Sequence, residues 1–577
     1  MLFMKVRLEK AFASVLTDLG VSAPKASFEH PEVIAHGDYA TGVALAYAKQ
    51  LGMKPRDLAE KIVGALKLGP LVEKIDIAGP GFINIHLSKQ FFAEALATIE
   101  KQGETFGTNA RLKGQKVLVE YTDPNPFKVF HIGHLMSNAV GESVARLMAA
   151  SGAKTVRANY QGDVGLHVAK AVWGMQSLNA TAKLAQLKQL PAAEQVAFIG
   201  KAYVHGSEQY EADKSAEAEI QLINQAVFDR KTAEVNILYD WGRKVTLDHF
   251  ELIYKKLGTK FDHYFFESEV AQDGLEMVRG GLGKSVFVES EGAIVFKGEE
   301  HGLHTRVFIT SRGLPTYDAK ELGLAKQKFE LIKPDLSIVV TANEQSEYYK
   351  VFMRALFLLS PEIAERTKHV SHGMMRFASG KMSSRKGNVV AGEALLADAE
   401  AMVAEKIKDR GFDAPTAAEV MEKVAVGAVK YSVLKSAAGS DIVYDPEKAV
   451  SFDGDSGPYL QYSYARALSV LRKPEAVALL KNSTSDIATG TEIGQLEKLL
   501  YRFPEVVDRA AGSFEPHFVT DYLTQLAGAF NAFYANNQII NPEDATTSAY
   551  RLRLARAFTT VMKNGLNLLA IPAVERM

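Results

Sequence analysis

Residues 116–160 show the pattern of two strands joined by one helix. KVLVEY at 116–121 is a continuous apolar run, and KTVRANY at 154–160 is a second candidate strand. Between them, apolar residues recur at three- and four-residue steps over 135–148, which indicates an amphipathic helix, and Gly152 is a stop signal. Strands joined by a helix in this way run parallel in one sheet, so the chain is expected to contain an α/β domain.

Further alternation predicts a larger sheet. TRVFITS at 305–311, a helix near 317–329 and LSIVVTA at 336–342 continue the order of strand and helix, which predicts a doubly wound parallel sheet. Residues 175–260 are rich in Ala, Gln, Lys and Glu with helical periodicity, and they are expected to form a helical insertion. Ligands of such sheets bind beyond the carboxyl ends of the strands.

The regions on either side differ in character. Helical patterns over 5–19 and 38–66 precede a strand–turn–strand signal around Gly79-Pro80-Gly81, which predicts a small α+β N-terminal domain. From about residue 390 the strand signal fades and long helical patterns dominate, so an all-helical C-terminal region is expected. A chain of 577 residues is too long for one core. We expect domains at 1–108, at 109–378 with the insertion inside it, at 379–450 and at 451–577.

The composition excludes several classes. The chain has no cysteine, which excludes disulfides, thiolate zinc sites and cysteine nucleophiles. Its first residues read as an amphipathic helix rather than a signal peptide, and no apolar run approaches the length of a membrane span, so a cytoplasmic protein is expected. A net charge of −1 does not indicate a nucleic-acid binder, so any polyanion would have to meet local basic patches.

The turn after the first strand carries the motif His131-Ile132-Gly133-His134, directly before the helix. A helix N-terminus offers free amide groups and a partial positive charge, which suit a phosphate. Gly133 permits close approach of a ring or phosphate, and the imidazoles can donate to a phosphoryl group as its charge develops. Either histidine alone would be interpreted as a polar cap residue, but the whole stretch in this position favours a nucleotide site.

A second motif, SGKMSSRKGNVV at 379–390, places Lys381, Arg385 and Lys386 among glycines and serines. This composition is typical of a mobile cationic loop that closes over the pyrophosphate of a nucleotide and stabilises the transition state. For any single lysine the alternative is a solvated surface turn, because short basic runs are common.

Together, the two motifs resemble the two signatures of the class I aminoacyl-tRNA synthetases. The first matches letter for letter, and Lys381-Met382-Ser383 opens the second. The resemblance implies a Rossmann-like catalytic domain that uses ATP with Mg²⁺, without zinc or an organic cofactor. An amino-acid carboxylate would attack the α-phosphate, and the aminoacyl group would then pass to a tRNA. The resemblance implies ATP contacts from His131, Gly133, His134, Gly162, Lys381 and Met382, and catalytic roles for Lys128, His131, His134, Lys381, Ser383, Arg385 and Lys386.

The second motif departs from the family pattern at its fourth position, where Ser384 stands in place of a lysine. Members of the arginyl branch with this altered loop carry a lysine just ahead of the first motif. Lys128 resembles that residue, and we expect it to supply the cation that Ser384 does not.

Other stretches resemble the arginyl-tRNA synthetases in particular, namely VEYTDPNP at 119–126, PTYDAKELGLA at 315–325 and TANEQSEYY at 341–349. A guanidinium is a rigid fork of donors best met by a carboxylate, so such a site can reject lysine by roughly 10⁴-fold without an editing domain. Two positions depart from the family: Glu321 stands where an aspartate is usual, and Val164 where an aromatic residue is usual. Without the surrounding matches, the acids and the tyrosine would be interpreted as surface or half-buried residues. The resemblance implies arginine-binding roles for Glu120, Asn125, Tyr317, Glu321 and Gln345.

The ends of the chain extend the resemblance. SFDGDSGPYLQYSYAR at 451–466 and the last helical stretch resemble the junction and close of an anticodon-binding domain, and residues 28–49 resemble the additional domain that meets the tRNA elbow. The implied partners are tRNA(Arg), L-arginine and ATP, with no membrane, and a monomer is expected. Unstacked loop bases are met by stacking as well as by charge, although the aromatic spacing here also suits a buried helix face. tRNA contacts are expected from Tyr459, Gln461, Arg466, Tyr534 and Asn536.

Three alternatives stay open at this point: a class I synthetase for another amino acid, a nucleotidyltransferase of the same fold, and a synthetase-like protein that binds RNA without catalysis. Ser384 keeps the last of these open.

Overall fold

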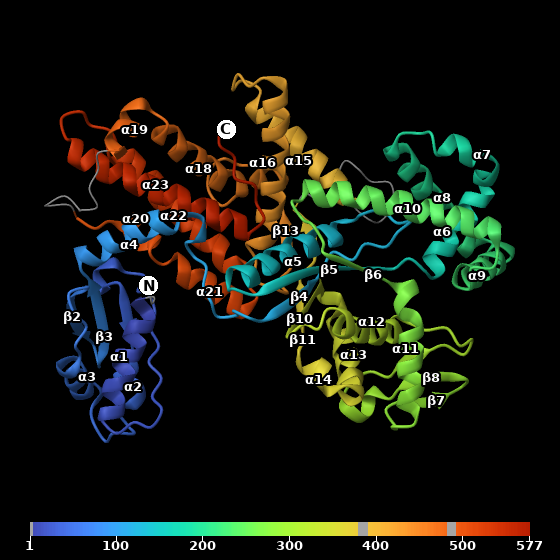
Figure 1. Ribbon diagram of the computed structural model, residues 1–577, viewed down its shortest axis with the longest axis horizontal. Coiled ribbons are helices and arrows are strands. Elements are labelled where there is room, and N and C mark those ends of the chain that lie inside the picture. The colour runs from blue at the N-terminus through green and yellow to red at the C-terminus, as the bar shows by residue number, and fades with distance from the viewer. Residues whose placement is uncertain (1–3, 379–390, 482–491) are drawn as a thin grey trace.

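A computed structural model describes residues 4–378, 391–481 and 492–577, and its centre is a five-stranded parallel sheet (Figure 1). The strand order is β11–β10–β4–β5–β6, and every neighbouring pair is parallel. The chain runs from β4 outward to β6 and then from β10 to β11 on the other side, so the direction of winding reverses between β4 and β10. The predicted doubly wound sheet is confirmed. Its strands are β4 (Lys116–Glu120), β5 (Lys154–Gln161), β6 (His263–Phe266), β10 (Leu336–Ala342) and β11 (Thr367–His372).

Both faces of this sheet are buried. Val117 and Val119 pack with α5 (Ile132–Ala150) in a hydrophobic core that continues into the C-terminal helices. Leu118 points to the other face, where it joins residues of α11 (Glu267–Leu282) and α12 (Tyr317–Leu331). Since successive side chains of a strand face opposite sides, a continuous apolar strand is the sequence of a sheet covered on both sides. Two further helices of this region are α13 (Ser346–Leu359) and α14 (Pro361–Glu365).

Residues 305–311, predicted to continue the parallel sheet, form a strand elsewhere, so that prediction was wrong. β9 (Arg306–Ile309) pairs antiparallel with β8 (Ala293–Phe296), which pairs antiparallel with β7 (Val288–Ser290). Val307 is 41% exposed whereas Phe308 is buried, and this one-sided burial is typical of an antiparallel surface sheet. Alternation of strand and helix along the sequence does not reveal which sheet a short strand joins.

The helical insertion lies between β5 and β6 and has its own hydrophobic core (Figure 1). It begins nine residues before the predicted start and ends close to the predicted boundary. Its helices are α6 (Leu166–Ser177), α7 (Ala180–Leu187), α8 (Ala192–Ala212), α9 (Lys214–Asp229) and α10 (Ala233–Lys256).

The N-terminal region is a three-stranded antiparallel sheet covered by helices, with a separate core. The strand–turn–strand signal is confirmed, but the helical pattern over 38–66 is interrupted, because Gly52 adopts a φ of +63° and Pro55 begins a new helix. Glu505 joins this region to the C-terminal helices, since His30 and Tyr39 both hydrogen-bond its carboxylate. The elements are α1 (Met4–Asp18), β1 (Tyr39–Thr41), α2 (Val43–Tyr47), α3 (Pro55–Ala65), β2 (Val72–Ala78), β3 (Phe82–Leu87) and α4 (Lys89–Gln102).

The part that follows residue 391 is helical in the described residues, apart from β13 (Ile442–Tyr444), which pairs in parallel with β12 (Met375–Phe377). None of the helices in the described part is long and apolar enough to cross a membrane. The helices are α15 (Gly392–Ile407), α16 (Ala414–Leu434), α17 (Pro446–Ala449), α18 (Gly457–Leu471), α19 (Pro474–Lys481), α20 (Gln495–Leu500), α21 (Phe503–Ser513), α22 (His517–Asn536) and α23 (Ala545–Leu568).

Candidate active site at the carboxyl edge of the sheet

The carboxyl ends of β4 and β10 lie side by side where the winding of the sheet reverses. Glu120, the last residue of β4, is in register with Val339 of β10, and the short 3-10 helix Asn343–Gln345 follows that strand. Ligands of open α/β sheets bind at such a reversal point. The loop from β4 to α5 starts there and carries the first motif.

That loop holds three non-glycine residues in the left-handed region, Thr122 (φ 81°), Asp123 (φ 48°) and Phe127 (φ 68°). Such a conformation costs about 1–3 kcal/mol per residue and persists only where neighbours fix it. Here the N–H of Thr122 donates to Ser137 Oγ at 2.9 Å, and the N–H of Tyr160 donates to Asp123 Oδ1 at 2.8 Å. Strain concentrated beside a strand end is typical of a functional loop.

His131 and His134 lie at the N-terminus of α5, with their rings stacked at 3.5 Å between centroids. The N–H of His131 donates to His134 Nδ1 at 3.2 Å, so a neutral His134 carries its proton on Nε2 and can donate it to a ligand. A Cβ on Gly133 would lie 3.0 Å from the His131 ring, so only glycine leaves that ring undisturbed. The motif therefore holds two rings and a free helix end in one place.

Both imidazoles are neutral in the free protein at pH 7. Burial, with a smaller effect from Lys128, lowers the pKa of His131 to about 4. Burial and then His131 hold the pKa of His134 well below its usual range. Burial also lowers the pKa of Lys128, against the opposing effect of Glu267. The ammonium of Lys128 lies 5.8 Å from the ring centroid of Tyr203 in α8, so it spans from the motif to the insertion.

Asn125 ties the loop to the end of β5. Its Oδ1 accepts the N–H of Gly162 at 3.2 Å, and a Cβ on Gly162 would lie 2.3 Å from that oxygen. The next residue, Asp163, is fully buried and forms an ion pair with Arg243 at 2.9 Å. Val164 is buried at 3% exposure.

Acidic side chains gather under this edge of the sheet. Glu120 and Glu267 are 1% and 2% exposed. Glu120 Oε2 lies 2.6 Å from Lys328 Nζ, and Glu267 pairs with Lys320. Both lysines project from α12 and are buried.

Two more acids near these pairs have strongly perturbed acidity. Burial, with Glu120 second, raises the pKa of Asp123 well above its usual range and that of Glu321 to about 8. The hydroxyls of Tyr160 and Tyr348 are buried without a hydrogen-bond partner among the described residues. Four acids share two lysines, and the raised pKa values show that Asp123 and Glu321 hold a proton more tightly than usual. The cluster could therefore accept a further cation as these acids release protons, and it has unused hydroxyl groups.

Two other predicted arginine contacts, Tyr317 and Gln345, lie at the exposed rim of this cluster. Tyr317 opens α12, is 56% exposed and carries the ammonium of Lys320 4.5 Å over its ring. Glu321 follows it by four residues on the same face of the helix. Gln345 is exposed at the start of α13. The sequence did not reveal Asp123, Glu267, Lys320 or Lys328; of these, Glu267 follows a parallel strand, which is the signal that could have found it.

The second motif lies outside the described residues, and with it the predictions for Lys381, Met382, Ser383, Ser384, Arg385 and Lys386. The residue that follows it is described: Ala391 forms an antiparallel bridge with His131. The N–H of Gly392 also donates to the carbonyl of Phe130 at 2.8 Å. The chain therefore leaves the second motif directly beside the first.

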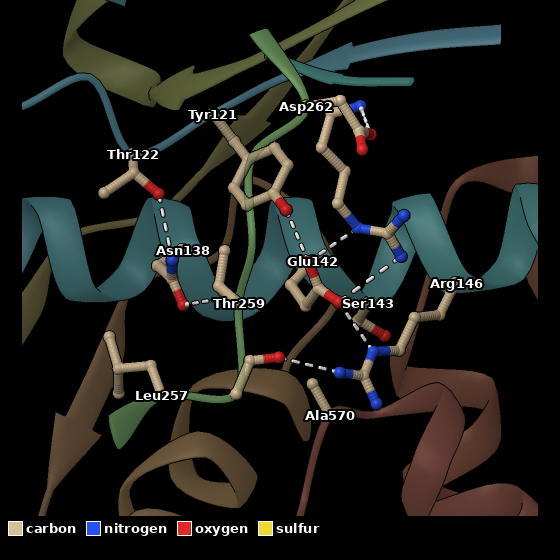
Figure 2. Close-up of polar contacts among 12 residues, drawn as sticks. Tyr121, Thr122, Asn138, Glu142, Ser143, Arg146, Leu257, Thr259, Asp262 and Ala570 are labelled. Atoms are coloured by element: carbon tan, nitrogen blue, oxygen red, sulfur yellow. Dashed lines mark hydrogen bonds and ion pairs between the residues drawn. The ribbon is translucent and has the colours of Figure 1, made fainter. Parts of the chain in front are cut away.

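Within α5, Glu142 is the centre of a buried polar network (Figure 2). It accepts hydrogen bonds from Tyr121, from Arg146 Nε at 2.7 Å and from Arg157 Nε at 3.0 Å. Since Tyr121 follows Glu120, the network fixes the end of β4 against the helix that begins with the first motif.

The same region holds the C-terminal segment. Arg146 donates to the carbonyls of Gly258 and Asn567 at 2.8 and 2.9 Å. Lys430 of α16 is buried and donates to the carbonyls of Leu257 and Ala570 at 2.5 and 3.0 Å. Burial lowers the pKa of Lys430 to about 7. These bonds attach the C-terminal helices to α5 and to the end of α10.

The predicted tRNA contacts fall into two groups. Tyr534 and Asn536 are exposed at the end of α22, and the guanidinium of Arg466 lies 5.4 Å from the Tyr534 ring centroid. Tyr459 is half-buried and its hydroxyl accepts from Asn531. Gln461 is fully buried and donates to the carbonyls of Lys423 and Pro572, so it joins helices and does not face a ligand. The prediction for Gln461 was wrong because its polar side chain is used up by carbonyls of neighbouring segments, which the residue type alone does not indicate.

Comparison with known proteins places this geometry in a family. The sequence model of the catalytic domain of the class I (R) tRNA synthetases matches residues 96–445. The fold and the site thus define a class I aminoacyl-tRNA synthetase. The models of the DALR anticodon-binding domain and of the arginyl-tRNA synthetase N-terminal domain match residues 460–577 and 6–87. The chain belongs to the arginyl-tRNA synthetase family.

Relatives agree along the whole chain. The arginine–tRNA ligase of Clostridium acetobutylicum is 31% identical over 564 residues, with 97% of this chain and 98% of the relative covered. That of Fusobacterium nucleatum is 32% identical, with 94% and 93% covered. The arginyl-tRNA synthetase structure of Thermus thermophilus superimposes with a TM-score of 0.81 at 25% identity, with 100% of both chains covered.

Proposed function

We propose that this chain activates L-arginine with ATP to arginyl-adenylate and transfers the arginyl group to the 3′ end of tRNA(Arg). AMP and pyrophosphate are the other products. The observation that carries the proposal is the cation-poor cluster of Glu120, Asp123, Glu267 and Glu321 under the edge that bears the first motif. Family membership gives the reaction class, and this cluster supports arginine as the amino acid.

In the first step, a carboxylate oxygen of arginine attacks the α-phosphorus of ATP and the bond to the pyrophosphate oxygen breaks. The protein supplies no nucleophile, so it acts by positioning and by stabilising charge. The α5 N-terminus and the Nε2 proton of His134 would donate to the phosphate oxygens. Gly133 and Gly162 allow the close packing that holds the His131 ring and Asn125 in place, because side chains there would meet those two residues.

The guanidinium of arginine would enter the acidic cluster. A carboxylate already paired with an ammonium through one oxygen can still accept a guanidinium N–H through the other. The hydroxyls of Tyr160 and Tyr348 and the carboxyl of Glu321 offer further acceptors. Lysine has fewer donors on a compact ammonium and would leave some of these groups unpaired.

In the second step, a hydroxyl of the terminal ribose attacks the acyl carbon and AMP leaves.

Lys128 and the cations of residues 381–386 would stabilise the pyrophosphate in the first step, with Lys128 in place of the lysine missing at Ser384. In the described residues no three His, Asp or Glu side chains are grouped to hold a metal, so Mg²⁺ would bind with the triphosphate.

We further propose that the N-terminal domain meets the tRNA elbow, that the C-terminal helices meet the anticodon, and that the chain works as a cytoplasmic monomer.

Pyrophosphate exchange with each of the twenty amino acids tests this proposal, provided tRNA is present, since the family generally needs it for adenylation. We expect exchange with arginine alone. Exchange with another amino acid would favour a different synthetase, and exchange without an amino acid would favour a nucleotidyltransferase. Binding of tRNA without any exchange would favour an RNA-binding protein without catalysis.

A further inference from the structure

Lys328 and Glu120 form a buried ion pair that none of the sequence motifs predicts. The Lys328 ammonium lies 2.6 Å from Glu120 Oε2, and the two side chains are 5% and 2% exposed. Lys328 lies on α12, eleven residues after Tyr317, and its side chain reaches Glu120 at the end of β4. Removing two charges from water to form a buried pair costs free energy. Because Glu120 is proposed to bind the substrate, we expect this pair to have a role beyond stability.

We propose that Lys328 is a positioning residue for arginine: its ammonium holds Glu120 Oε2, so that Oε1 is left to receive the guanidinium. The inference rests on the proposed function. Lys328 itself touches neither the nucleotide nor the reacting atoms, because it lies behind the carboxylate that would touch the substrate.

The surroundings of Glu120 explain why it needs a resident cation. Among the described residues, the titratable groups whose pKa Glu120 shifts are acids and phenols: Asp123 on the loop after β4, Glu321 on α12, Tyr160 on β5 and Tyr349 on α13. A buried carboxylate that loses its charged partner is left uncompensated among such groups. Without Lys328, Glu120 would no longer be held where the guanidinium can reach it.

The same geometry offers a matched control. Lys326 lies two residues earlier on α12 and forms an ion pair with Asp273 of α11 at 2.5 Å. Its side chain is 33% exposed and does not border Glu120. Lys326→Met therefore removes one charge and one ion pair from the same helix without changing the acidic cluster.

The test is the arginine KM of the full-length chain, measured by tRNA-dependent pyrophosphate exchange at pH 7 and pH 9, always as a ratio to the wild type. A hydrogen bond or ion pair to a buried charged group typically contributes about 10- to 100-fold to binding. We expect the KM ratio of Lys328→Met to be about 10 to 100 at both pH values, with kcat within about threefold of wild type. Lys326→Met should show ratios near 1 at both pH values.

Two further variants separate positioning from folding. Glu120→Gln combined with Lys328→Met removes both charges, and we expect a KM ratio no higher than that of Glu120→Gln alone, because Lys328 acts only through Glu120. If Lys328→Met does not fold, Lys328→Gln replaces it, since it keeps a hydrogen-bond donor without the charge and carries the same expectation. A KM ratio near 1 for Lys328→Met, or a ratio for the double variant well above that of Glu120→Gln alone, overturns the inference.

The outcomes also distinguish this inference from the proposed function. A wild-type chain that shows no arginine-dependent exchange removes the proposed function itself. A wild-type chain that is active with arginine, with a raised KM in Glu120→Gln and an unchanged KM in Lys328→Met, overturns the role of Lys328 alone.

Discussion

The backbone of Ala391 pairs with the backbone of His131 as an isolated antiparallel bridge. Ala391 directly follows the second motif, and His131 opens the first, although 260 residues separate them in the chain. This contact explains how two distant motifs could serve one triphosphate. The end of β4 fixes the position of the first motif, and the bridge fixes the point at which the chain leaves the second motif. The account of adenylation depends on this proximity.

Replacing Lys128 tests the compensation for Ser384. We expect Lys128→Ala to lower the adenylation rate by about 10²–10³-fold, since removal of one preorganised group that stabilises developing charge has this effect. tRNA affinity should change by less than about threefold. Pyrophosphate exchange and filter binding measure the two quantities. Lys183→Ala, on an exposed face of α7, is the control, and similar losses in exchange and in tRNA binding by Lys128→Ala would contradict the idea.

Gly133→Ala tests the packing of the imidazoles. The new Cβ would lie 3.0 Å from Cε1 and Nδ1 of His131, so the ring has to move away from its place beside His134. We expect the KM for ATP to rise at least tenfold while the melting temperature changes little. In the helix α8, a Cβ at Gly200 meets no atom within 4 Å, so Gly200→Ala should leave the KM unchanged and stabilise by about 0.5–1 kcal/mol. Equal KM values for the two variants would show that the His131 ring has no part in nucleotide binding.

Glu321 predicts a pH dependence. Burial, with Glu120 as the second cause, raises its pKa to about 8, so most of it is protonated at pH 7 in the free protein. If its ionised form binds the guanidinium, the arginine KM of the wild type falls as the pH rises from 7 to 9, and Glu321→Gln removes that part of the change. Glu330→Gln, at the exposed end of the same helix, should retain it. A wild-type KM that is flat over this range would exclude Glu321 as an ionisable contact.

The titration of Glu321 also changes the stability of the fold, and the direction of that change can be stated. The pKa of Glu321 is higher in the folded protein than in the unfolded chain, so the folded state binds the proton more tightly and loses stability as the pH rises from about 4.5 to 8. Denaturant unfolding at pH 5 and pH 8 should show a smaller loss for Glu321→Gln than for the wild type. An equal loss would mean that Glu321 titrates alike in both states.

Lys430 tests the attachment of the C-terminal helices. Lys430→Met leaves the buried carbonyls of Leu257 and Ala570 without this donor, and each such loss costs about 1–3 kcal/mol. We expect the unfolding free energy to fall by at least 2 kcal/mol. Lys423 on the same helix forms a surface pair with Glu419, so Lys423→Met should cost only about 0.3–0.5 kcal/mol. Equal effects of the two substitutions would contradict a structural role for the buried amine.

The sequence predicted the elements with a clear period. The helix after the first motif, expected from apolar spacing and Gly152, runs over Ile132–Ala150, and the hairpin around Gly79-Pro80-Gly81 is present. Both depend on local patterns that packing only reinforces. The strand at 305–311 failed because sheet membership is decided by distant partners.

The candidate site was predictable only where motifs mark it. His131, Gly133 and Glu120 stand at recognisable positions, whereas Lys320 and Lys328 look like ordinary surface residues of a helix. Their burial depends on carboxylates contributed by β4 and α11, more than fifty residues away in the sequence. No local pattern encodes such a pairing, and for the same reason the burial of Gln461 could not be foreseen.

Aminoacylation tests the whole account most directly. The purified chain is incubated with total tRNA, ATP and labelled arginine, and acid-precipitable label and AMP are measured together. The account predicts arginyl-tRNA and AMP in equal amounts, with no charging by lysine at the same concentration. Retention of tRNA without any release of AMP, or charging by an amino acid other than arginine, would contradict it.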